Sequence, residues 1–261
     1  MDLSNTQRRE KLLRIVPVGE IWGIGSRTAQ KLNQLNIHSA WDLASQSPDR
    51  IQGLFNIVVA RTVLELNGVS CIDLDLSPAN KQQIVCSRSF SRRLTDVTTL
   101  SQALAEFCSR AAEKLRQQNS VTQCISIFIR TSPFNPQEPQ YQRSASIHLT
   151  QATQDTRIII NKAQQLLKEV FKAGYNYQKC GVQLSHIQSA TTHHQIDLFS
   201  VQANELITEN TALMAVMDNI NRRFPKKMTI AATSFDKSWK PKAELISPNY
   251  TTNWQDLLKV K

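Results

Sequence analysis

The spacing of apolar residues changes near residue 79, and before that point it is the spacing of short helices. Ser39 and Asp42 form a capping-box pattern, and Pro48 stands at a first helical position. Gly68 follows an apolar run of helical period and is placed as its C-cap. The sequence therefore predicts a small helical domain over residues 1–78.

Beyond this point, strand and helix patterns alternate. The predicted order is a strand at 83–90, a helix at 100–115, strands at 121–130 and 143–149, a helix at 159–171 and a strand at 179–187. This β-α-β-β-α-β order predicts an α+β domain over 79–187, with both helices on one face of a sheet. The other face is predicted to be open. Simple alternation points these side chains toward it: Ser126, Arg130, Ser144, Ser146, Lys179 and Gln183.

The last quarter of the chain is less regular. Residues 188–210 are polar and aperiodic, which predicts a linker. Residues 211–261 contain one helical pattern, from Leu213 to Ile220, followed by irregular sequence with Trp239 and Trp254. We expect a small C-terminal domain there.

Positive charge is concentrated in the middle of the chain. The net charge is +10, and residues 79–187 contribute 14 basic and 6 acidic residues. Such a surplus favours a polyanionic partner such as nucleic acid, although a solvated basic face has the same composition. No apolar run approaches the ~20 residues that span a bilayer, and no secretory signal is visible. Transmembrane and secreted classes are thereby excluded, and we expect a cytoplasmic, nucleoid-associated protein.

Metal and redox sites are not indicated. The five cysteines have no Cys-x-x-Cys spacing, so we expect most of them to be buried as small apolar residues. His193 and His194 are adjacent but have no other potential metal ligands near them in the sequence. Asp73 and Asp75 are predicted to lie in a solvated connector. We therefore predict no metal ligands.

A glycine turn near the N-terminus has the pattern of a helix-hairpin-helix. Gly23 and Gly25 flank one apolar residue and precede a predicted helix. Glycine allows a phosphate to approach the backbone, the free N–H groups of the next helix attract anions, and Arg27 and Lys31 add positive charge. Such a hairpin binds the DNA backbone without reading bases. A plain turn between two helices is the alternative.

Several segments together resemble the Y-family lesion-bypass DNA polymerases. The segment PVGEIWGIG at 17–25 looks like the entry to their thumb, and CSRSFS at 86–91 looks like the first strand of their little finger. AAEKLR at 111–116, RTSPF at 130–134 and LISPNYTT at 245–252 resemble the bacterial UmuC subgroup, the polymerase V catalytic subunit. The resemblance runs over essentially all 261 residues.

The resemblance implies a thumb, a little finger and a UmuC-type C-terminal domain. With the glycine turn and the positive charge, it predicts these DNA-contacting residues: Gly23, Gly25, Arg27, Lys31, Arg88, Ser89, Ser91, Arg92, Arg93, Arg130 and Lys179. For each of the arginines from Arg88 onward and for Lys179, a surface salt bridge is the alternative. Trp22 and Trp41 are expected in the thumb core, because large aromatic side chains are usually buried; an exposed stacking platform is the alternative. In the family, the palm carboxylates hold Mg2+ for nucleotide transfer, and no segment here corresponds to palm or fingers. We therefore assign no catalytic residue and no cofactor to this chain.

A second motif lies inside the predicted linker. It consists of Gln195, Ile196, Asp197, Leu198 and Phe199, and it resembles the peptide that binds the bacterial β sliding clamp. Two adjacent apolar side chains in polar sequence can fill a pocket on a partner. A short strand or helix end packed on the core is the alternative. UmuD′ and the RecA filament are further partners that the resemblance leaves open.

Three functions follow, in order of support. The first is the DNA-binding portion of an SOS-response translesion DNA polymerase that is inactive by itself. The second is a non-enzymatic regulator that binds DNA and the clamp in competition with intact polymerases. The third, a helix-hairpin-helix nuclease or glycosylase, requires an acid–base or metal constellation that the sequence does not show.

Overall fold

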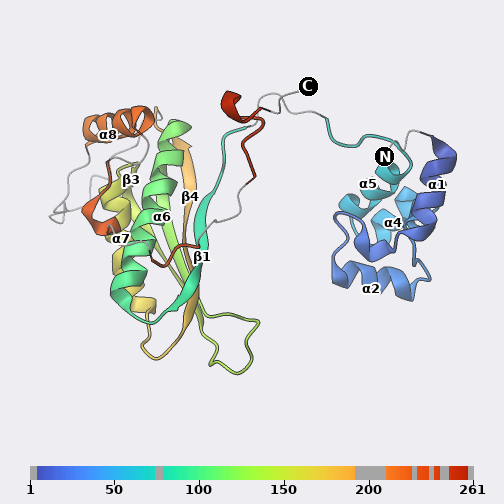
Figure 1. Ribbon diagram of the computed structural model, residues 1–261, viewed down its shortest axis with the longest axis horizontal. Coiled ribbons are helices and arrows are strands. Elements are labelled where there is room, and N and C mark those ends of the chain that lie inside the picture. Colours follow the sequence, from blue (N-terminus) through green and yellow to red (C-terminus); the bar gives the residue numbers. More distant parts are fainter. Residues whose placement is uncertain are drawn as a thin grey trace. The chain divides into compact units, whose positions relative to one another are not determined.

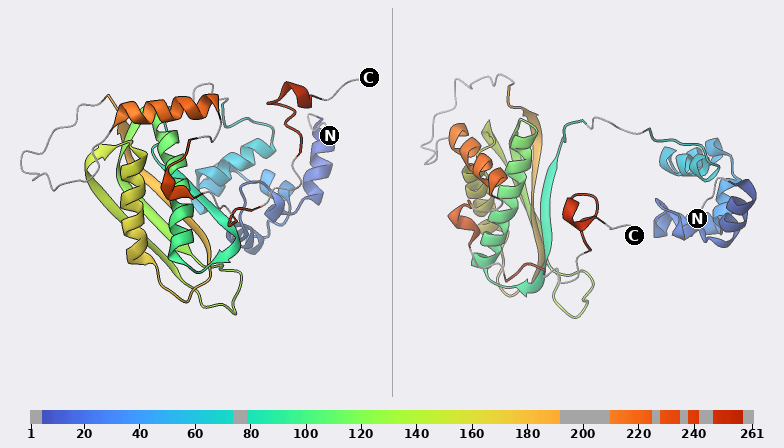
Figure 2. Two further views of the ribbon diagram at one scale, coloured as in Figure 1. Left: turned by 60° about the vertical axis from the view of Figure 1, so that its left-hand side comes forward. Right: turned by 45° about the horizontal axis from the view of Figure 1, so that its top comes forward.

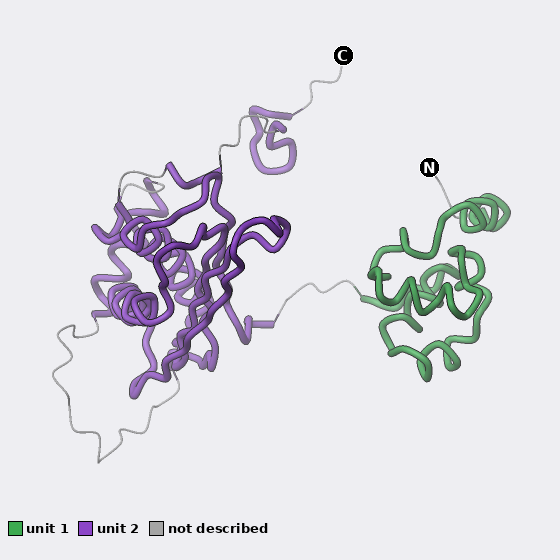
Figure 3. The backbone as a smooth tube through the Cα atoms, turned by 90° about the horizontal axis from the view of Figure 1, so that it is seen from below, with its two compact units in different colours: residues 1–78 green, residues 79–261 purple. Residues whose placement is uncertain are grey.

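The computed structural model describes residues 5–73, 79–191, 210–224, 228–234, 238–241 and 247–257 (Figure 1). The chain separates into two compact units, residues 1–78 and residues 79–261 (Figure 3). Each unit has its own hydrophobic core.

Unit 1 is helical. Its elements are α1 (Thr6–Ile15), η1 (Val18–Glu20), α2 (Ser26–Gln34), α3 (Ala40–Ala44), α4 (Pro48–Leu54) and α5 (Ile57–Leu66). The predicted helix signals are confirmed: Ser39 and Asp42 form the capping box of α3, and Pro48 begins α4. Gly68 has a φ of +88°, the left-handed conformation that commonly ends a helix.

A short antiparallel pairing closes unit 1 around its core. The N–H of Val18 donates to the carbonyl of His38 at 2.8 Å, and the N–H of Ala40 donates to the carbonyl of Val16 at 2.9 Å. These bonds connect the segment before η1 to the segment before α3. The glycine turn lies between them in the chain, so both ends of the hairpin are fixed.

Unit 2 contains a four-stranded antiparallel sheet in the order β1-β4-β2-β3. Its elements are β1 (Ile84–Leu94), α6 (Val97–Gln117), β2 (Ser120–Arg130), β3 (Gln142–Thr153), α7 (Thr156–Val170) and β4 (Tyr177–Ser189). Both helices lie on the same face of the sheet (Figures 1 and 2). The predicted β-α-β-β-α-β order is confirmed.

Four of the five cysteines lie in the core of unit 2, as expected from their spacing. They are Cys86, Cys108, Cys124 and Cys180, while Cys71 in unit 1 is partly exposed. Burial raises the pKa of the Cys108 thiol well above its ordinary value. Because the thiolate is the reactive form, this thiol is held as an inert apolar group.

The C-terminal segments that the structure describes are α8 (Thr211–Arg223), η2 (Ala231–Thr233) and η3 (Trp254–Asp256). Asp218 of α8 forms a bidentate ion pair with Arg116 of α6 at 2.6 and 2.7 Å. The side chain of Trp239 is 1% exposed and meets the rings of Phe90 and Phe107 edge-on. Trp239 therefore belongs to the same hydrophobic core as the sheet.

Asp155 attaches the start of this C-terminal region to the sheet domain. Its carboxylate is completely buried and accepts hydrogen bonds from Arg157 and from the backbone N–H of Asn210. Burial opposes ionisation of this carboxyl, but these hydrogen bonds outweigh it and hold the pKa of Asp155 below its ordinary value.

Candidate nucleic-acid interface

The face of the sheet that α6 and α7 leave uncovered is formed by three rows of residues, each crossing all four strands. In the order β1, β4, β2, β3, the rows are Ser89, Lys179, Arg130 and Gln142; Ser87, Gly181, Phe128 and Ser144; and Val85, Gln183, Ser126 and Ser146. We call these twelve residues the open face. The six side chains that alternation pointed toward this face all lie in it, so that prediction is confirmed. The open face contains no acidic residue.

Two cations lie directly opposite each other on the open face. Arg130 of β2 is the cross-strand partner of Lys179 of β4, and both side chains are half-buried. Neither forms an ion pair within the described part of the chain. Like charges directly opposite in a sheet lower its stability. An anion placed over the pair would remove this repulsion.

An aromatic ring occupies the middle row of the open face. A Cβ built on Gly181 would lie 2.7 Å from the ring of Phe128 and 2.4 Å from the Cβ of Ser87. Only glycine therefore fits at this position, and the ring of Phe128 lies across the backbone of β4. The result is a small apolar surface beside the Arg130–Lys179 pair. The sequence signal for it was a glycine inside a strand pattern, which marks close approach of another group.

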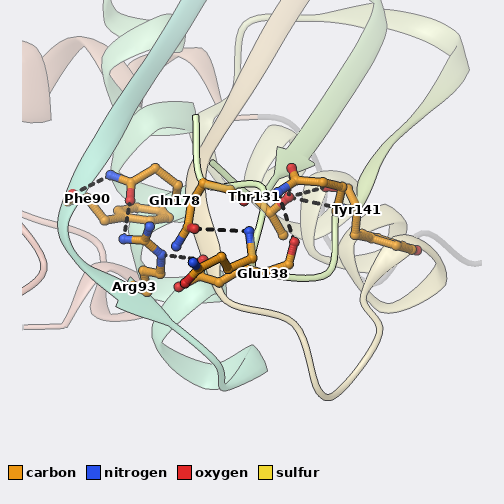
Figure 4. A network of polar contacts seen from close by, with 9 residues as sticks. Phe90, Arg93, Thr131, Glu138, Tyr141 and Gln178 are labelled. Atoms are coloured by element: carbon orange, nitrogen blue, oxygen red, sulfur yellow. Dashed lines mark hydrogen bonds and ion pairs between the residues drawn. The ribbon is translucent and has the colours of Figure 1, made fainter. Parts of the chain in front are cut away.

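The strand β1 leaves its register with β4 between Ser89 and Leu94. Gln178 of β4 fills the space at this bulge: its side chain donates to the carbonyl of Phe90 at 2.9 Å and accepts from Arg93 at 3.2 Å. The guanidinium of Arg93 also donates to Glu138 at 2.7 Å (Figure 4). The bulge carries three predicted DNA-contacting residues, and Arg93 is already engaged inside the protein.

Ser91 and Arg92, the other two predicted DNA-contacting residues at the bulge, form hydrogen bonds with the C-terminal region. The N–H of Ser91 donates to the carbonyl of Trp239 at 3.0 Å, and the guanidinium of Arg92 donates to the hydroxyl of Ser238 at 2.7 Å. The segment 238–241 therefore covers the outer edge of β1 at the bulge. Bulges are frequent next to functional sites, where they redirect side chains.

Arg88 lies on the other side of the sheet from the open face. Its register partner is the buried Cys180, so its side chain starts from the helix-covered face at the edge strand. There it lines a hollow of about 140 Å³ together with Arg110 and Lys114 of α6. The assignment of Arg88 to DNA stays a prediction, but this side chain does not share a face with Arg130.

The glycine turn of unit 1 leaves backbone groups accessible. Gly23 has a φ of +89°, which explains a glycine there. Gly25 has an ordinary φ of −76°, and an added Cβ would meet nothing within 4 Å, so the fold itself does not require glycine at this position. α2 begins here without a side-chain cap and without an acidic residue in its first turn. Its free N–H groups, with exposed Arg27 and Lys31 on α2, are suited to a phosphate.

The expectation that Trp22 lies in a core is wrong. The side chain is 97% exposed, because it stands at the outer corner of the glycine turn. Trp41 is half-buried, with the guanidinium of Arg14 lying 4.7 Å from its ring centroid.

The motif at 195–199, His193, His194 and Asp75 lie outside the described residues. Among the residues that the structure describes, there is no group of three or more side chains suited to holding a metal ion. No helix in the described ranges has the length and apolar character needed to cross a membrane.

Three segments of the chain match known domain families. Residues 6–37 match the IMS family HHH motif, residues 81–198 match the impB/mucB/samB family C-terminal domain, and residues 211–260 match a domain of unknown function, DUF4113. The hairpin and the sheet domain therefore have the domain types of the Y-family polymerases. A solved DinB from Sulfolobus solfataricus has 19% identity and a TM-score of 0.33, covering 69% of this chain and 50% of that one.

Within this class, the chain belongs to the UmuC type. It is 42% identical to Protein UmuC and 43% identical to Protein SamB, both of Salmonella typhimurium, over 100% of its own length. It spans 61% of each of these relatives and corresponds to their C-terminal part. A DNA polymerase IV of Clostridium acetobutylicum is 26% identical over 86% of this chain and 54% of that protein.

Proposed function

We propose that this chain is the DNA-grasping portion of a UmuC-type translesion DNA polymerase in the SOS response to DNA damage. The observation that carries the proposal is the Arg130–Lys179 couple, which has no ion-pair partner among the described residues and lies on an open face without acidic residues. Two half-buried like charges opposite each other cost the sheet stability, and a bound anion would remove that cost. Serine hydroxyls and amides around the couple are suited to phosphate and sugar oxygens.

The two units supply complementary contacts in this proposal. In unit 1, the N-terminus of α2 binds a phosphate, and in unit 2 the open face binds the backbone of the duplex. None of these contacts reads base edges, which suits an enzyme that must follow DNA of any sequence. By itself, we expect this polypeptide not to add nucleotides, because phosphoryl transfer needs a set of carboxylates that holds Mg2+ ions.

A salt series with a primed duplex tests this function. For about four to six phosphate contacts, affinity should fall by about 10²- to 10³-fold between ~50 and ~200 mM salt, with little dependence on sequence. Fluorescence anisotropy measures the binding, and primer extension with Mg2+ and nucleotides should show no product. Failure to bind at ~50 mM salt would refute DNA grasping, whereas an extended primer would refute only the inactivity.

The motif at 195–199 is proposed to bind the β sliding clamp. Its support is the sequence alone: Leu198 and Phe199 are adjacent apolar residues that follow a glutamine in a polar segment. UmuD′ and the RecA filament are further partners of the proposed role.

Changing Leu198 and Phe199 together to alanine should abolish capture by immobilised clamp, because the pocket-filling side chains are removed. DNA affinity should not change. The matched control is Leu206→Ala with Ile207→Ala, an adjacent apolar pair in the same polar segment. Equal capture by both double variants would remove the clamp assignment.

A further inference from the structure

The turn that carries Trp22 holds its indole in solvent. The N–H of Ile24 donates to the carbonyl of Ile21 at 3.0 Å, and Gly23 has a φ of +89°. A positive φ at the third residue is typical of a type II turn, in which Trp22 is the second residue. Ile24 is buried and Ile21 packs against the core, so the residues that close the turn hold it to unit 1. The exposure of Trp22 therefore follows from the backbone.

At 97% exposure, this side chain adds little to the packing of the described part of unit 1. Within the described residues, Trp22 takes part in no ring–ring contact and no cation–ring contact. By contrast, Trp41 lies under a guanidinium and Trp239 is buried. A tryptophan offers one of the largest apolar surfaces of any side chain, so a fully exposed indole contributes least to stability and most to binding a partner.

The surroundings of Trp22 favour nucleic acid as the partner. α2 begins at its N-cap, Gly25, three residues after Trp22. Because this helix start has no side-chain cap, the N–H groups of its first turn are open to an anion. Arg27 and Lys31 are exposed on α2 and form no ion pair within the described residues. In a nucleic-acid strand, the surface adjoining each phosphate is a sugar, whose carbon atoms form an apolar face.

We propose that the indole of Trp22 packs against the sugars of the strand whose phosphate is bound at the N-terminus of α2. The inference rests on the proposed function and adds an apolar contact to a site otherwise built from charge and backbone groups. Because every nucleotide carries a sugar, the contact is independent of sequence. Because it is apolar, it contributes to affinity without releasing counterions.

The salt dependence of binding separates this contact from the charged ones. With the full chain and a primed duplex, Trp22→Ala should weaken binding about tenfold at every salt concentration and leave the slope of log K against log salt unchanged. Arg27→Gln with Lys31→Gln should instead lower the magnitude of that slope by about 2. Trp22→Phe, which keeps a ring, should retain most of the affinity.

Trp254→Ala is the matched control, because Trp254 is 89% exposed but lies in unit 2 beside Asp256. It should bind as the wild type does. If the wild type binds and Trp22→Ala binds equally well, the indole contact is refuted while the proposed function stands. If Trp22→Ala changes the slope, Trp22 acts through charge positioning and the sugar contact is refuted. If the wild type fails to bind at low salt, both proposals fall.

Discussion

Replacing Trp239 with alanine should lower the free energy of unfolding of unit 2 by about 3–5 kcal/mol, the range for deleting a buried aromatic side chain. The indole is 1% exposed, with its ring centroid 5.9 Å from that of Phe90 and 5.6 Å from that of Phe107. Nothing else in the described residues fills this position between β1 and α6. Urea unfolding followed by circular dichroism measures the change.

A phenylalanine at position 239 separates packing from hydrogen bonding. The indole Nε1 of Trp239 is buried and has no hydrogen-bond partner among the described residues. Trp239→Phe keeps an aromatic ring and removes an unsatisfied donor, so the loss should stay below about 1.5 kcal/mol. Trp254→Ala, at an exposed position, should change stability by no more than about 0.5 kcal/mol. If Trp239→Ala resembled Trp254→Ala, the C-terminal segment would not be part of the core.

The role of Trp239 extends to the bulge of β1, which carries residues predicted to contact DNA. Its carbonyl accepts the hydrogen bond from the N–H of Ser91, and the neighbouring Ser238 accepts from Arg92. The C-terminal region, which matches a domain of unknown function, therefore positions residues that the sequence assigns to DNA. Its packing is a condition for the geometry of the bulge.

Periodicity predicted the open face correctly because β2, β3 and β4 keep strict alternation over the rows that form it. A side chain in such a strand has only two directions, so Ser126, Arg130 and Lys179 followed from counting. The helix ends of unit 1 could also be predicted from short segments, because the capping box at Ser39 and the C-cap at Gly68 depend only on residues within one helical turn.

The rest could not be predicted from local patterns, because a neighbouring turn or a distant segment decides the outcome. Trp22 was placed in the core because of its size, but the turn at Gly23 directs it outward. Charge and the resemblance predict both Arg88 and Arg130 as DNA contacts, but they do not show that the register places Arg88 on the helix-covered face. The burial of Trp239 depends on contacts with Phe90 and Phe107. Both residues lie more than 100 positions away in the chain, so no local pattern predicts these contacts.

The Arg130–Lys179 couple leads to a prediction in which stability and binding change in opposite directions. Lys179→Glu would convert a repulsive cross-strand pair into an ion pair and stabilise unit 2 by about 0.2–1 kcal/mol. The same change would place a negative charge on the open face and engage Arg130. DNA affinity should therefore fall by about 10- to 100-fold, and the salt slope should lose about 1 to 2 units.

Lys168→Glu is the control that separates this local effect from the loss of net charge. Lys168 is exposed on α7, the helical layer on the other side of the sheet, and the substitution changes the charge of the chain by the same amount. Its effect on affinity should be small, because charges beyond about 10 Å are largely screened at physiological salt. Equal loss of affinity in both variants would mean that only the overall field of unit 2 attracts DNA. If Lys179→Glu alone gains stability and loses DNA affinity, then the Arg130–Lys179 pair lowers the stability of the sheet through its repulsion but is needed to bind the DNA strand.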